Sequence, residues 1–143
     1  MSFETPFAST VFDGKITASA HEHGGTGPQS IIRTNQSWAV NVSWTNEGLA
    51  TGMITGSYHL HLLLERIGPG GDLDLIDPAD HIIPITPGPS PVNYSRHVDV
   101  AAGVVPAGVY KLVVLLRYLE PGGAPGPMSA YEEISPLLEF YDP

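Results

Sequence analysis

Strict alternation of apolar and polar residues is the feature that most constrains how this chain folds. Between Ser37 and Thr45, tryptophan or valine occupies every second position, and Ala39, Asn41, Ser43 and Thr45 fill the places between. Neighbouring side chains of a β-strand point to opposite faces of the sheet. The pattern therefore predicts a strand with one face in a core and the other in solvent.

Further strands are predicted wherever similar patterns lie between turns rich in glycine and proline. The longest are expected at Ser57–Glu65, Val92–Val100 and Val109–Leu119, and shorter ones at 11–20, 31–34, 73–76, 81–85 and 137–141. Pro84 has no N–H to donate to a neighbouring strand, which places its strand at a sheet edge. Residues 121–127 contain three prolines and three glycines, and we expect a long loop there.

The length and composition of the chain agree with a single domain built from such strands. With 143 residues, one domain spanning residues 1–143 is expected. The 16 glycines and 14 prolines suit many short strands joined by tight turns. The sequence predicts an all-β, antiparallel two-sheet β-sandwich of about 7–9 strands.

Charge and cysteine content limit the classes of partner and the compartment. The formal charge of −9 disfavours binding to nucleic acids and to anionic membrane surfaces, although it is compatible with divalent cations. The chain has no cysteine, no basic and apolar leader, and no run of 18 apolar residues. We therefore expect a cytoplasmic protein that binds neither nucleic acid nor membranes.

Two stretches resemble the fibronectin type III family. The first is Val42-Ser43-Trp44 followed by Ile54-Thr55-Gly56-Ser57-Tyr58, and the second is Pro106-Ala107-Gly108-Val109-Tyr110 followed by a long strand. The resemblance covers about half of the chain and implies an immunoglobulin-like or fibronectin III-like sandwich. It also implies that Trp44 lies under the core and that the Tyr110 hydroxyl bonds to backbone near Val104. The segment 65–104 is longer than that family requires, and the resemblance implies no functional residue.

The predicted strand at 109–119 is apolar on both faces. Its outward face includes Val113, Leu115 and Leu119, where a solvent-facing strand would carry polar side chains. Exposed apolar patches commonly mark interfaces, so we expect these residues to pack against another protein or another copy of the chain. An alternative is that the last strand or the N-terminal segment covers this face within one chain.

Histidines supply a different candidate site. His59 and His61 lie two positions apart, on one face of one predicted strand, and His97 is a possible third ligand for zinc or a similar metal. A second pair, His21 and His23, lies in a glycine-rich segment. The competing interpretation is that these residues are the polar outer faces of their strands.

Four aspartates supply a second metal hypothesis. Asp72, Asp74, Asp77 and Asp80 follow a turn, and calcium prefers several oxygen ligands from one flexible segment. The spacing is not that of an EF-hand, and charges beside a short strand also keep a sheet edge from pairing with other chains.

Sequence signatures of hydrolases, phosphate-binding loops and dinucleotide-binding folds are absent from the chain. We therefore expect a non-enzymatic protein-binding or self-assembly module, with no cofactor and with homo-oligomers as the expected state. The alternatives are a metal-dependent small-molecule binder or enzyme that uses the histidines, and a calcium-dependent sugar-binding or adhesion module.

Overall fold

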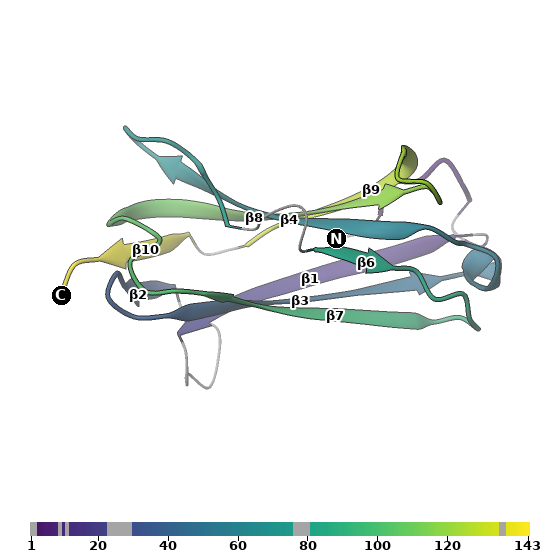
Figure 1. Cartoon of the computed structure of the whole chain (residues 1–143), viewed down its shortest axis with the longest axis horizontal. Helices are drawn as coiled ribbons and strands as arrows, with labels where there is room; N and C mark the ends of the chain where they lie inside the picture. Colours follow the sequence, from purple (N-terminus) through teal and green to yellow (C-terminus); the bar gives the residue numbers. More distant parts are fainter. Residues whose placement is uncertain (1–2, 9, 11, 23–29, 76–80, 135–136) are drawn as a thin grey trace.

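Two layers of β-strands face each other in the computed structural model, which describes residues 3–8, 10, 12–22, 30–75, 81–134 and 137–143 (Figure 1). The three-stranded sheet has the order β1-β3-β7 and is antiparallel throughout. Its strands are β1 (Asp13–Glu22), β3 (Trp38–Glu47) and β7 (Val92–Val100).

A seven-stranded sheet forms the other layer, with β8 (Gly108–Leu119) and β4 (Ser57–Ile67) at its centre. On the far side of β8 lie β9 (Pro125–Glu133) and β10 (Leu138–Tyr141), which pair with different parts of that strand. On the far side of β4 lie β5 (Leu73–Asp74) and β6 (Ile82–Pro84), and β2 (Ile31–Arg33) extends the sheet beyond β10. A 3-10 turn, η1 (Leu49–Gly52), follows β3.

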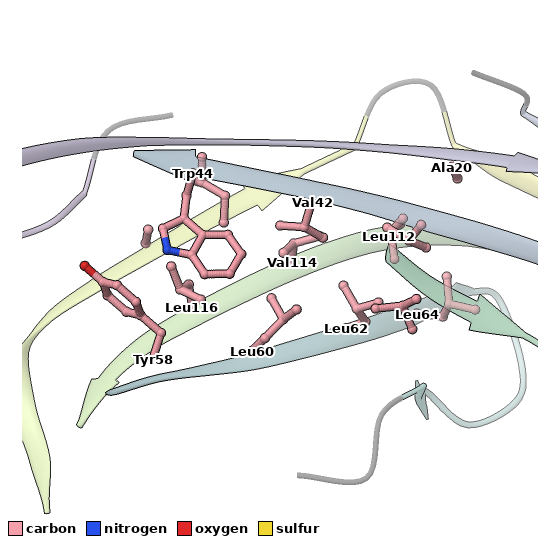
Figure 2. Close-up of a cluster of buried hydrophobic side chains, with 14 of the residues drawn as sticks. Ala20, Val42, Trp44, Tyr58, Leu60, Leu62, Leu64, Leu112, Val114 and Leu116 are labelled. Atoms are coloured by element: carbon pink, nitrogen blue, oxygen red, sulfur yellow. The ribbon is translucent and has the colours of Figure 1, made fainter. Parts of the chain in front are cut away.

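The core lies between the inner faces of the two sheets, as the alternation predicted. Figure 2 shows Val42 and Trp44 of β3 opposite Leu60, Leu62 and Leu64 of β4. These side chains are almost fully buried, and so are the alternate residues Leu112, Val114 and Leu116 of β8. The expectation that Trp44 lies under the core is confirmed, with 1% of its surface exposed.

One polar contact joins the two layers inside this core. The Tyr58 hydroxyl of β4 donates a hydrogen bond to Oδ1 of Asn46 on β3, at 2.6 Å. Burial raises the pKa of Tyr58 far above its usual range, so the phenol keeps the proton that it donates. The bond satisfies an amide that is itself 2% exposed.

The tyrosine contact implied by the family resemblance is also present at the start of β8. The Tyr110 hydroxyl donates to the carbonyl oxygen of Pro106 at 2.9 Å, two residues beyond the position expected. Arg66 stabilises the same turn, because its guanidinium lies over the Tyr110 ring and donates a hydrogen bond to the carbonyl oxygen of Ala107 at 3.1 Å.

Three sequence-based expectations about the strands need correction. The sandwich is not purely antiparallel, because β2 runs parallel to β10. Alternation fixes which face a residue occupies and says nothing about the direction of its partner, and more than a hundred residues separate these two strands. Ten strands are present among the described residues, beyond the range of 7–9.

The tenth strand arises because the last three residues of the expected loop at 121–127 belong to β9, while residues 121–124 lie outside any strand. Pro125 and Pro127 did not prevent a strand there, since β9 lies beside β8 at the sheet's margin and prolines are tolerated where no ladder donor is needed. Gly126 is required for packing, because a side chain at this position would collide with the Tyr118 ring.

Short strands form several edges of the seven-stranded sheet, whereas the three-stranded sheet has long edge strands. Pro84 lies on β6, which pairs with β4 alone among the described strands, so its predicted edge position is confirmed. The long edge strand β7 carries Arg96 opposite Val42, on the core-facing side. The Arg96 side chain is exposed, and a charge on an edge strand discourages pairing with strands of other molecules. No helix among the described residues has the length and apolar content needed to cross a membrane.

Candidate functional site

The outward side chains of β4 and β8 and of the strands beside them form the candidate site. We define the outer patch as the outward-facing residues of β4, β5, β6, β8 and β9. Its apolar members are Leu63, Ile67, Ile82, Val109, Val113, Leu115, Leu119 and Tyr131, and its polar and charged members are His59, His61, Glu65, Asp74, Lys111, Arg117 and Glu133.

Strand register arranges this patch in rows across the sheet. Val113 lies between Leu63 of β4 and Glu133 of β9, and the next row places Leu115 between His61 and Tyr131. Apolar side chains therefore meet at the centre of the patch. Lys111 pairs with Glu65 in the row on one side, and Arg117 pairs with His59 in the row on the other.

The three residues predicted as an interface differ in their positions. Val113 is only 8% exposed although it points away from the core, and Leu115 beside it is half-buried. Leu119 lies at the end of β8, separated from Leu115 by Arg117, at a point where the register with β9 shifts. Val113 and Leu115 belong to the centre of the patch, and Leu119 to its margin.

Segments proposed to cover this face within the chain lie elsewhere. The last strand, β10, extends the same sheet and sends Leu138 and Phe140 into the core. In the N-terminal segment, Phe3 is buried in the core and Glu4 pairs with Ser129 of β9. Neither of these described segments lies over Val113 and Leu115.

His59 and His61 lie on the outer patch, on the shared face that their spacing predicted. Their ring centroids are 4.2 Å apart. Partial burial lowers the pKa of His61, and the neighbouring His59 and Arg117 lower it further, against the opposite effect of Asp74. His61 is therefore a neutral imidazole at pH 7, and its Nε2 is buried without a hydrogen-bond partner.

His97 is not brought to this pair. It lies on the outer face of the three-stranded sheet, where its ring nitrogens contact Asn41 Oδ1 at 2.6 Å and Asp99 Oδ1 at 2.9 Å. His21 of β1 lies beside it, with ring centroids 6.0 Å apart. This contact could not be predicted from the sequence, because it depends on the register of two strand pairs, which places β1 and β7 on opposite sides of Asn41.

Both metal hypotheses remain predictions. Within the described ranges, no group of three or more histidine, cysteine, aspartate or glutamate side chains is arranged to hold a metal ion. Asp72 accepts a hydrogen bond from the backbone N–H of Arg66 at 3.0 Å and so closes the β4–β5 turn. Asp74 lies opposite Leu63, whereas Asp77, Asp80 and His23 lie outside the described residues.

Comparisons with known proteins add no relative to this picture. No family model, no curated protein and no solved structure matches the chain. The candidate site therefore rests on its own geometry.

Proposed function

We propose that this protein is a non-enzymatic association module that pairs with a second copy of itself through the outer patch. The observation that carries the proposal is the cluster of Leu63, Val113, Leu115 and Tyr131, which lie side by side on the outside of a sandwich. Solvent-facing sheet surfaces are normally polar, and contiguous apolar surface favours contact with another molecule.

The distribution of charge favours contact between the outer patches of two copies over contact through any other surface of the molecule. The outer patch carries three carboxylates, from Glu65, Asp74 and Glu133, and two cations, from Lys111 and Arg117, while the chain has a formal charge of −9. Most of the negative charge therefore lies elsewhere, where two copies repel each other. The outer patch is the surface on which two copies meet with little net repulsion.

The size of the patch is adequate for a dimer. A strand of the 11 residues of β4 is about 36 Å long at about 3.3 Å per residue. The face comprises 11 residues of β4, 12 of β8, 9 of β9, 2 of β5 and 3 of β6, so with strands about 4.8 Å apart it covers roughly 600 Å² in projection. Stable interfaces bury about 800 Å² per partner, and the outer patch approaches that size without another surface.

We also propose that the sandwich is related to fibronectin type III domains. Two features support this kinship: the separation of β1, β3 and β7 from β4, β8 and β9, and the bond from Tyr110 to Pro106. The parallel β2–β10 edge lies outside that pattern. An experimentally determined structure with a different strand order around β8 would refute the kinship without affecting the proposed association.

Sedimentation equilibrium of the purified protein tests the proposed association. We expect a dimer at micromolar concentration, and we expect Leu115→Glu to be a folded monomer because it places a charge in the apolar centre. Ser43→Glu, on the exposed outer face of β3, is the matched control and should remain dimeric. A wild-type protein that is monomeric throughout, or a dimer that Leu115→Glu leaves intact, would refute the proposal.

A further inference from the structure

We infer that the two copies pair about a twofold axis that runs parallel to the strands between β4 and β8, and that Lys111 and Glu65 specify this arrangement. The inference rests on the proposed self-association and adds the orientation of the partner and the residues that select it. It follows from the register of β4 and β8, which fixes the order of side chains across the patch.

Two sheets that face each other by twofold symmetry need an axis lying in the plane between them. An axis parallel to the strands places β8 of one copy over β4 of the other, row upon row. Val113 then lies over Leu63 of the partner subunit, and Val109 over Ile67 of the partner subunit. Apolar side chains therefore meet in these two rows, whereas Leu115 lies over His61 of the partner subunit.

The same axis places opposite charges together. Lys111 of each copy lies over Glu65 of the partner subunit, which gives two equivalent attractive pairs. Arg117 lies over the imidazole of His59 of the partner subunit. The row of Val113 places Asp74 over Glu133 of the partner subunit, but each Glu133 is 3.6 Å from Lys111 of its own copy, and this cation offsets the like-charge repulsion.

An axis perpendicular to the strands gives a less favourable charge pattern. It keeps β8 over β8 and reverses the order of rows about the centre between Val113 and Leu115. Lys111 would then face Arg117 of the partner subunit twice, close to the apolar centre. Like charges across an interface disfavour a pairing, so the charge pattern selects the parallel axis.

Charge reversal tests the inference, because the two axes predict opposite results. With the parallel axis, Lys111→Glu and Glu65→Lys should each weaken the homodimer by about tenfold or more, since each creates two like-charge pairs. An equimolar mixture of the two variants should form heterodimers, and the double variant K111E/E65K should dimerise again. With the perpendicular axis, Lys111→Glu should strengthen the dimer, because the new carboxylate would face Arg117.

Sedimentation equilibrium of each variant, and native mass spectrometry of the mixture, give the readouts. Lys15→Glu, an exposed residue on β1, is the matched control for the loss of a cation and should dimerise like the wild type. A stronger K111E dimer, or a mixture with no preference for heterodimers, overturns the inferred axis while leaving self-association intact. A wild-type protein that never dimerises instead overturns the proposed function itself.

Discussion

The outer faces of the two sheets differ in chemistry although both enclose the same core. On the three-stranded sheet, outward positions of β3 carry Asn41, Ser43 and Thr45, and the neighbouring strands add further hydroxyl and charged groups. On the seven-stranded sheet, outward positions of β8 carry Val109, Val113 and Leu115. Only one of these faces has the polarity expected of a surface that stays in water.

The difference shows that inward alternation and outward chemistry are independent signals. Inner residues of β3 and β8 are equally buried, so formation of the core requires nothing of the outward set. An outward apolar row therefore points to an additional contact, and we assign that contact to a second copy. The polar face of β1, β3 and β7 then serves as an internal control for every experiment on the outer patch.

The largest effect should come from the shared core, where the two sheets should not differ. Ile16→Ala on β1 and Leu62→Ala on β4 each remove a fully buried side chain and should lower the free energy of unfolding by about 2–5 kcal/mol. Urea denaturation, at a protein concentration too low for the dimer to form, measures the free energy of unfolding of both variants. A loss under about 1 kcal/mol in only one of them would show that one sheet contributes little to the core.

A smaller loss is expected when the polar contact between the sheets is broken. Tyr58→Phe removes the donor to Asn46 and leaves a buried amide oxygen without a partner, which should lower stability by about 1–3 kcal/mol. Adding Asn46→Leu should recover part of that loss, because no unpaired polar group then remains. If the double variant is less stable than the sum of the single changes, the contact does not act as described.

Acid should affect the two faces differently. His61 has a lowered pKa in the free protein, and a second copy would bury it further, so the dimer binds fewer protons than two separate copies. Association should therefore be stronger near pH 7.5 and weaken as the pH falls below the ordinary pKa of histidine. The variant His59→Gln, His61→Gln should lose this pH dependence, whereas His97→Gln on the opposite face should keep it.

The smallest effect should come from the polar face itself. His97→Gln removes contacts to Asn41 and Asp99, but the histidine side chain is 51% exposed, so unfolding free energy should change by no more than about 0.5 kcal/mol. Thermal melting with matched protein concentrations checks this value. A loss above about 1 kcal/mol would indicate that the cluster around His97 has a structural role that its exposure conceals.

Sequence patterns predicted most of the strands because alternation is a local property. The bounds expected for β7 are those of the structure, β8 begins one residue earlier than expected, and β3 begins one residue later and ends two residues later. In contrast, β9 was missed because its prolines and glycine resemble a loop, and only its place beside β8 explains why they are tolerated. Parallel pairing of β2 with β10 is equally a property of the assembled sheet.

The candidate site, too, could be predicted from the sequence only in part. The outward positions of Val113, Leu115, His59 and His61 follow from alternation within single strands. The rows that join Lys111 to Glu65 depend on the register between β4 and β8, which alternation does not define. Likewise, the separation of His97 from the other two histidines follows from its pairing with Asn41 in the other sheet.

The most direct test of the claim that two copies associate through the outer patch is the distance between them, measured by double electron–electron resonance. The chain has no cysteine, so a single nitroxide label can be placed by Ile67→Cys on the outer patch or by Ser43→Cys on the polar face. Sheets pack about 10 Å apart, so paired copies should give a distance of about 10–25 Å at residue 67 and more than about 30 Å at residue 43. A short distance at residue 43, or no intermolecular distance at residue 67, would contradict the account.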